Sequence, residues 1–169
     1  MMRTFGWPEF LFILEAAKWT IALSAIAFAG GSIVGLMVAL ARTAESRVLQ
    51  FAATVFTQIF QGTPLLLQLF LVFFGIALFG VEVPAWLAAG LTLTLWSASF
   101  LAEIWRGCVE AIPRGQWEAS SVLAMNYVQQ MRYVILPQAL RIALPPTIGF
   151  SVQIIKGTAV TSIIGFVEL

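Results

Sequence analysis

Long apolar runs with almost no charge decide what this chain can fold into. Its 169 residues are 60% hydrophobic and 10% charged, whereas a soluble domain carries about 25% charged residues. A run of about 20 apolar residues is long enough to cross the roughly 30 Å hydrocarbon layer of a membrane as a helix. We therefore predict an all-α integral membrane protein with transmembrane spans at about 19–41, 55–80, 86–105 and 147–167.

Residues 1–18 precede the first run and are too short and too charged to form a span of their own. Their mixture of aromatic, apolar and charged residues predicts an amphipathic helix lying on the outer membrane surface. A cleaved signal peptide is the alternative interpretation. Glu9 and Glu15 disfavour it because they interrupt the apolar run, and Arg3 alone makes a weak basic region.

The arginines predict the orientation of the chain in the membrane. Two of them lie between the first two apolar runs, and four lie in or beside the long loop before the last run. They are Arg42 and Arg47, then Arg106, Arg114, Arg132 and Arg141. Because positive residues collect on the cytosolic side, we expect both loops in the cytosol and the N-terminus outside.

Charge and residue counts also exclude some classes of function. With a net charge of +1, the chain lacks the excess of positive charge that is typical of nucleic-acid-binding proteins. With no histidine and one cysteine, Cys108, the chain offers no set of ligands for zinc. We therefore expect neither a metal site nor a nucleic-acid partner.

The first span carries a face of small residues. Ala27, Gly31, Gly35 and Ala39 recur every fourth residue, and such a face lets another helix approach closely. That helix belongs either to a partner subunit or to this chain.

The second span carries a polar face and a break. Its polar residues share one helical face at spacings of four, three, four and seven; they are Gln50, Thr54, Thr57, Gln61 and Gln68. Polar groups in hydrocarbon need partners or water, so the face turns toward a subunit interface or a wet cavity. Pro64 and Gly62 predict a kink beside Thr63, as in transporters that expose backbone groups to a substrate. The alternative is that the glutamines only join helices together.

Two later positions place charge within the membrane. Glu103 shares a face with Thr92 and Ser99 and lies one turn before Arg106, so the two can pair, either as a structural lock or as part of an inner gate. Lys156 lies inside the last run, and a lysine there costs at least about 2.5 kcal/mol unless it finds a partner or a wet cavity.

The loop at 107–146 is the longest polar-rich interval. We expect a short helix at about 116–123, a second at 127–135 that Pro137 ends, and a last span that Pro145 and Pro146 begin. Ala119, Val122 and Leu123 form an apolar ridge that is too small to be a core and should dock in a groove on a partner.

Two short motifs bound the polar part of this loop: Glu118-Ala119-Ser120 stands at its start and Ile135-Leu136-Pro137 at its end. With these motifs the loop resembles the EAA loop of ABC importer permeases. Further matches narrow the resemblance to the polar amino acid uptake permeases of histidine, glutamate and arginine type. They are QGTPLL from Gln61, Ala102-Glu103-Ile104, Arg106-Gly107, IPRGQ from Ile112 and PQALR from Pro137.

The sequence departs from the family pattern at three positions. Gln61 replaces an arginine, Ala124 replaces the glycine of the loop, and Gly157 replaces the acidic residue that follows the late lysine. If the turn at Ala124 is left-handed, alanine costs about 1 kcal/mol more than glycine there.

The resemblance implies a type I ABC importer permease core whose loop contains a coupling helix. It implies a transport subunit rather than an enzyme, with ATP and Mg bound by separate ATPase subunits. The implied partners are those ATPases, a second permease copy or a sister permease, an extracytoplasmic substrate-binding protein and the lipid bilayer of a bacterial inner membrane. The family has one more helix after the last run, so we expect this chain to lack it.

The resemblance also assigns candidate sites. The coupling residues are Gly115, Glu118, Ala119, Ser120, Leu123, Ala124, Ile135, Leu136 and Pro137. The candidate substrate pathway comprises Gln61, Thr63, Gln68, Ser99, Glu103 and Lys156, of which Lys156 would suit the carboxylate of an amino acid.

Two other classes of function compete with the ATP-driven importer. An ion-gradient-driven transporter or channel fragment would leave the amphipathic loop unexplained, and Glu103 and Lys156 are few groups for proton coupling. A non-transporting membrane scaffold would leave the aligned polar faces of the second and third spans unexplained.

Overall fold

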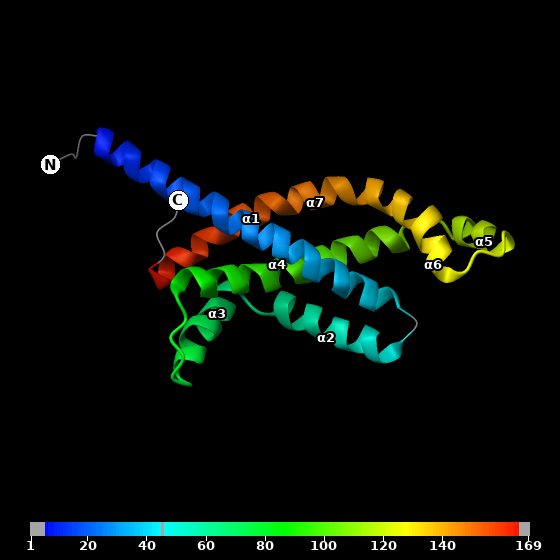
Figure 1. Cartoon of the computed structure of the whole chain (residues 1–169), viewed down its shortest axis with the longest axis horizontal. Coiled ribbons are helices and arrows are strands. Elements are labelled where there is room, and N and C mark those ends of the chain that lie inside the picture. Colours follow the sequence, from blue (N-terminus) through cyan, green and yellow to red (C-terminus); the bar gives the residue numbers. More distant parts are fainter. Residues whose placement is uncertain (1–5, 45, 166–169) are drawn as a thin grey trace.

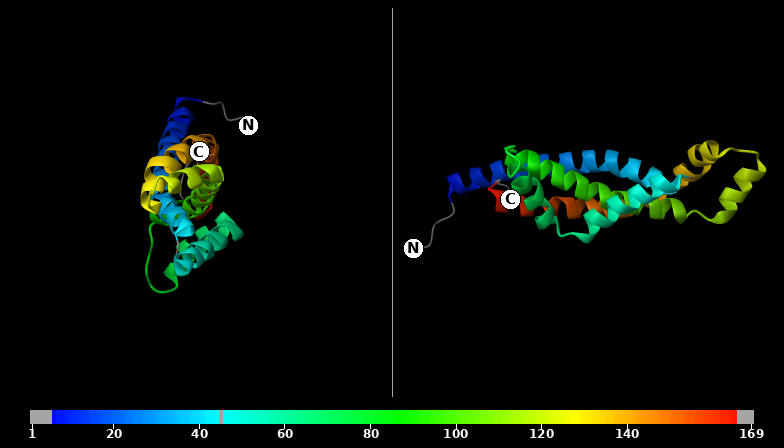
Figure 2. Two further views of the ribbon diagram at one scale, coloured as in Figure 1. Left: turned by 90° about the vertical axis from the view of Figure 1, so that its right-hand side faces the viewer. Right: turned by 90° about the horizontal axis from the view of Figure 1, so that it is seen from below.

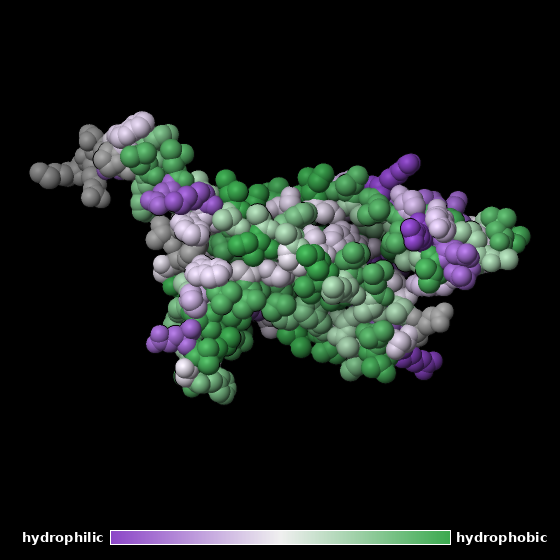
Figure 3. Space-filling view, in the orientation of Figure 1, coloured by the Kyte–Doolittle hydropathy of each residue, from purple (hydrophilic) through white to green (hydrophobic). Residues whose placement is uncertain are grey.

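Four long helices run alternately up and down one axis of an elongated bundle (Figure 1). They are α1 (Trp7–Thr43), α2 (Arg47–Gly62), α4 (Ala85–Glu110) and α7 (Leu136–Thr158). The computed structural model describes residues 6–44 and 46–165. Apolar side chains cover most of the visible flank of the bundle, and hydrophilic residues gather toward its ends (Figure 3), as expected for a body surrounded by lipid.

By length and composition, three helical stretches of the described residues could cross a membrane: Glu9–Thr43, Ala85–Glu110 and Tyr127–Ile164. A fourth crossing results if the bent pair Arg47–Gly62 and Leu65–Gly75 counts as one span. The predicted all-α architecture is therefore confirmed, although the helix ends differ from the expected spans.

Helix α1 continues through the boundary that we expected at residue 18. Its first turn is capped by Glu9, which accepts a hydrogen bond from the backbone N–H of Gly6 at 3.0 Å. No proline or glycine interrupts the sequence between Glu9 and Ala29, so the helix propagates. From Trp7 onward, the expected interfacial segment is the first part of α1, not a separate helix, and residues 1–5 lie outside the described part.

The small-residue face of α1 packs against α4 of the same chain. Ala27, Gly31, Gly35 and Ala39 are all buried. A Cβ atom added at Gly31 would lie 2.7 Å from Ser97 Cβ, and one added at Gly35 would lie 3.0 Å from the Ala98 carbonyl oxygen. The close approach of the two helices therefore accounts for this face within the chain.

We expect Gly31→Ala to destabilise the bundle by about 1–3 kcal/mol, because an extra methyl group has no room at this contact. Gly149→Ala is the matched control, since a Cβ there meets nothing within 4 Å; as a helix position it should gain up to about 1 kcal/mol. Thermal unfolding of the purified protein in detergent measures both changes. Equal melting temperatures for the two variants would contradict this packing.

The second apolar run is broken at Thr63 and Pro64. Helix α2 ends at Gly62, and α3 (Leu65–Phe70) with the π-helical turn Leu71–Gly75 continues at an angle of 103°. The expected kink is thus confirmed as a sharp bend, and the helix begins at Arg47 rather than at residue 55. The break frees the last carbonyls of α2. The buried Gln68 amide donates to one of them, that of Phe60, at 2.8 Å, and to the carbonyl of Thr63 at the break itself, at 2.9 Å.

The prolines near the last span do not interrupt its helix, contrary to our expectation. The chain is helical from α6 (Tyr127–Gln130) through the π-helical turn Met131–Ile135 into α7 and a final 3-10 turn, Ala159–Ile164. Pro137 lies just after the π-helical turn, where the regular α-helical hydrogen-bond pattern is already interrupted, so a missing N–H is tolerated. Pro145 and Pro146 lie on the exposed face of α7, so the core contacts of its buried residues are kept.

Candidate functional site

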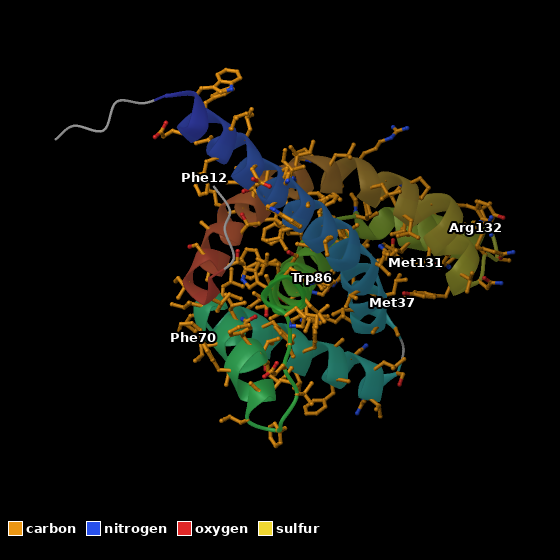
Figure 4. All side chains as sticks on the ribbon, turned by 60° about the vertical axis from the view of Figure 1, so that its left-hand side comes forward. Phe12, Met37, Phe70, Trp86, Met131 and Arg132 are labelled. Atoms are coloured by element: carbon orange, nitrogen blue, oxygen red, sulfur yellow. The ribbon has the colours of Figure 1, made fainter. Side chains whose placement is uncertain are left out.

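A helical hairpin projects from one end of the bundle, beside the turn between α1 and α2 (Figures 1 and 2). It consists of α5 (Arg114–Val122), a turn, and α6 with the π-helical turn that leads into α7. Figure 4 labels Met131 and Arg132 in this hairpin. Both loops that carry the arginines therefore lie at the same end of the molecule, as the charge pattern predicted.

The hairpin has an apolar base of its own. Ile112, Met131, Ile135 and Ala139 are buried together, and Trp117 of α5 packs against them. This cluster fixes α5 to the ends of α4 and α7, so the hairpin can move with those helices.

The predicted coupling residues divide between the base and the outer surface of the hairpin. Ile135 and Ser120 are buried, and Leu136 and Pro137 begin α7. The others are exposed: Gly115, Glu118, Ala119, Leu123 and Ala124. Val122 is 86% and Leu123 74% exposed. The described part of the chain leaves the apolar ridge of α5 uncovered.

The turn between α5 and α6 requires a left-handed residue, and Ala124 supplies it with a φ of 56°. The N–H of Met125 donates to the carbonyl of Ser120 at 3.3 Å, which closes the end of α5. Asn126 then begins α6 through reciprocal hydrogen bonds with Gln129, at 2.9 and 3.0 Å. The sequence left open whether this turn is left-handed; the positive φ of Ala124 shows that it is, so the alanine is strained there.

We expect Ala124→Gly to stabilise the hairpin by up to about 1 kcal/mol, because glycine adopts a positive φ without the Cβ penalty. Ala119→Gly in the middle of α5 is the matched control and should cost about 1 kcal/mol. Amide hydrogen exchange over residues 119–127 reports both effects. Faster exchange in Ala124→Gly than in the unchanged protein would show that the turn is not strained by alanine.

Beneath the hairpin, a cluster of ion pairs joins three helices. Glu103 of α4 accepts hydrogen bonds from Arg42 of α1 and from Arg106, which also pairs with Glu110. Arg42 donates further to the hydroxyl of Thr57 in α2 at 3.3 Å. The two arginines and two glutamates neutralise one another, so the cluster holds α1, α2 and α4 together without net charge.

The predicted pairing of Glu103 with Arg106 is therefore present, but the sequence analysis missed Arg42. That residue lies 61 positions before Glu103, so no helical spacing could connect them. The one signal in the sequence was that Arg42 lies at the end of the first apolar run, and an arginine at such a position is typical of the cytosolic side of a span.

The candidate pathway residues are only partly brought together. The Gln61 amide donates to the Ser99 carbonyl at 2.9 Å and so joins α2 to α4. Thr63 and Gln68 bond to each other at the break. These contacts agree with the view that the glutamines join helices.

Lys156 stands apart from these residues as an exposed side chain of α7 that forms no ion pair within the described residues. The next residue, Gly157, approaches the break: a Cβ there would lie 3.5 Å from Leu65 Cδ2 and 3.6 Å from Trp96.

Two aromatic residues of the hairpin were also missed as functional candidates. The rings of Trp117 and Tyr127 stack with centroids 6.4 Å apart. The Tyr127 hydroxyl donates to the carbonyl of Thr43, the last residue of α1, at 2.9 Å. The sequence signal that could have identified them was the presence of two aromatic residues in an otherwise polar loop.

A family model described as "Binding-protein-dependent transport system inner membrane component" matches residues 31–168. The chain belongs to this family. The predicted resemblance to ABC importer permeases is thus confirmed, and the chain is a transmembrane permease subunit of such an importer. Membership implies an inner-membrane location and, as partners, ATPase subunits and a substrate-binding protein.

Similar proteins of this family are named as amino-acid permeases. The chain is 35% identical over 161 residues to the probable amino-acid ABC transporter permease protein YckA of Bacillus subtilis (strain 168), covering 95% of this chain and 71% of that one. It is 35% identical over 165 residues to the glutamine transport system permease protein GlnP of Escherichia coli (strain K12), covering 96% and 75%.

Solved structures agree with the fold. The chain superposes on a subunit of an amino acid ABC transporter crystallised with histidines with a TM-score of 0.91 at 32% identity, covering 99% of this chain and 80% of that one. A permease chain of the MetNI methionine ABC transporter, in an inward-facing conformation, gives a TM-score of 0.82 at 22% identity and shows the fold alone.

Proposed function

We propose that this chain passes a polar amino acid across the inner membrane of a bacterium, driven by separate ATPase subunits that dock on the α5 hairpin. The observation that carries the proposal is the exposed ridge of Val122 and Leu123 on a hairpin anchored by its own apolar cluster. A small apolar surface on a rigid base suits a groove in a soluble partner. The names of the relatives, one for amino acids and one for glutamine, support the class of substrate.

In this mechanism, ATP binding would draw two ATPase subunits together, and each would carry a hairpin with it. Two permease chains, identical or sister, would then change from an inward-facing to an outward-facing state, and hydrolysis would reset them. A binding protein outside would deliver the amino acid, with the N-terminus on that side. ATP and Mg would bind to the partner, and this chain would hold no cofactor.

The substrate would cross near the break between α2 and α3. The exposed Gln61 lies there, hydrogen-bonded to the backbone carbonyl of the buried Ser99 in α4. Lys156 stands apart on α7 as an exposed cation without an ion pair in the described part. A lysine at this depth is stabilised by an anion, so the carboxylate common to amino acids would be its partner. Glu103 would hold helices together rather than line the pathway, because its carboxylate pairs with Arg42 and Arg106.

Reconstitution tests the proposal. The permease is placed in proteoliposomes with its ATPase and binding protein, and uptake of a panel of radiolabelled amino acids is measured with and without ATP inside. We expect uptake of a polar amino acid that requires both ATP and the ATPase. Uptake that follows an imposed proton or sodium gradient without the ATPase would contradict the proposal and favour a secondary transporter.

A further inference from the structure

We propose that Tyr127 is a positioning residue that transmits movement of the α5 hairpin to the ion cluster between α1, α2 and α4. Its hydroxyl ties the hairpin to the last residue of α1, next to the arginine that organises the cluster. The inference rests on the proposed function, in which the ATPase moves the hairpin.

The first observation is that Tyr127 belongs mechanically to the hairpin. It is the first residue of α6, and its ring stacks on Trp117 of α5 at 6.4 Å with an interplanar angle of 24°. Trp117 in turn packs on the buried cluster around Ile135. A displacement of α5 therefore displaces the Tyr127 ring.

The second observation is that the hydroxyl of Tyr127 reaches α1. It donates to the Thr43 carbonyl at 2.9 Å across 84 positions of sequence. The last carbonyls of a helix have no partner within the helix, so the tyrosine supplies a donor that the end of α1 needs. The hairpin is thus hydrogen-bonded to the last residue of α1. No further turn of α1 follows that could absorb movement of the hairpin.

The third observation is the position of Arg42, directly before Thr43. Its guanidinium contacts Glu103 of α4 and, at 3.3 Å, the hydroxyl of Thr57 in α2. A shift of the Thr43 backbone therefore changes the geometry of a cluster that three helices share. In such a cluster each charged group pairs with one of a few discrete partners. A small shift of the backbone can therefore change which groups pair, and so which helices are held together.

The fourth observation is a gap in the packing at this end of the bundle. A cavity of about 170 Å³ lies between α1, α4 and α7. Leu40 and Thr43 of α1 line it, together with Val109 of α4 and Leu136 and Ala139 of α7. Close-packed side chains transmit strain, and a cavity interrupts that contact. The hydrogen bond of Tyr127 bridges α1 and the hairpin beside this gap.

The test compares Tyr127→Phe with the unchanged complex of permease, ATPase and binding protein in proteoliposomes. Phenylalanine keeps the ring and its stacking on Trp117 and removes only the donor. Import of a radiolabelled amino-acid mixture and release of phosphate are measured together. We expect the number of amino acids imported per ATP hydrolysed to fall roughly two- to tenfold, the range that one uncharged hydrogen bond supports.

Two measurements separate coupling from folding. The melting temperature and the amount of co-purified ATPase should remain unchanged in Tyr127→Phe. Tyr133→Phe is the matched control, because Tyr133 is 64% exposed and also loses only a hydroxyl; its import per ATP should equal that of the unchanged protein. Tyr127→Leu removes the stacking as well, so its ratio should fall at least as far as that of Tyr127→Phe.

Unchanged import per ATP in Tyr127→Phe would overturn the inference, whatever the result for Tyr127→Leu. Glu118→Lys, measured in parallel, separates this failure from that of the proposed function. If Glu118→Lys uncouples import from ATP hydrolysis and the Tyr127 variants do not, the proposed docking of the ATPase is supported and the proposed role of Tyr127 is wrong. If none of the three variants changes import, the proposed function fails together with the inference.

Discussion

Glu118→Lys should abolish ATP-driven import, with a loss of at least tenfold, while the permease still folds. Glu118 is exposed on α5 and forms no ion pair within the described residues, so its reversal costs little inside this chain. In the proposed complex, where α5 docks on the ATPase, the same change would place a lysine on the docking surface in place of a carboxylate. Like charges brought together at an interface cost several kcal/mol. Import into proteoliposomes and co-purification of the ATPase measure the effect.

The control for this variant is Glu82→Lys, which makes the same change of charge in the segment between α3 and α4. That segment lies at the end of the bundle away from the hairpin (Figure 1). It should leave the amount of co-purified ATPase unchanged. Import at the normal rate in Glu118→Lys would show that the hairpin is not a docking element, whatever the behaviour of the control.

The second large effect is expected from Glu103→Gln. The change leaves Arg42 and Arg106 near each other without the carboxylate that joins them. The removal of one partner from a fully buried pair costs about 3–5 kcal/mol, but Glu103 is 36% exposed, and exposed pairs contribute at most about 1 kcal/mol. We therefore expect a loss of about 1–3 kcal/mol, measured as a lower melting temperature in detergent.

A double-mutant cycle isolates the pair. Arg42→Gln combined with Glu103→Gln removes both charges, so the double variant should be less destabilised than the sum of the single variants. Strict additivity would mean that Arg42 and Glu103 do not stabilise each other and that the cluster does not join α1 to α4.

Lys18→Gln is the control for an exposed ion pair, because Lys18 pairs with Glu15 on the surface. It should change the free energy of unfolding by less than about 1 kcal/mol.

The sequence predicted the features that depend on local spacing. Apolar runs located the spans, and the four-residue spacing from Ala27 to Ala39 predicted a close helix contact. Pro64 predicted the break, and Ala124 marked a turn that alanine would strain if the turn were left-handed. Each follows from helical periodicity or from a single backbone preference, which are properties of a short segment.

The sequence analysis was wrong, or made no prediction, for contacts between segments that lie far apart in the sequence. The small face of α1 could have served a partner subunit until α4 was placed against it. Arg42 and Tyr127 were missed because their partners lie 61 and 84 positions away. Pro137, Pro145 and Pro146 suggested helix ends because an isolated helix would break there, but in the folded chain a π-helical turn and an exposed face accommodate them.

Site-specific photocrosslinking at Leu123 tests the central claim most directly. A photoreactive amino acid replaces Leu123, which is 74% exposed at the tip of α5, and a second sample carries it at Val152, an exposed residue in the middle of α7. In membranes that contain the complete transporter, we predict an adduct between position 123 and the ATPase subunit and none from position 152. An adduct only within the permease, or none from position 123, would contradict the claim that the hairpin is held by a separate ATPase.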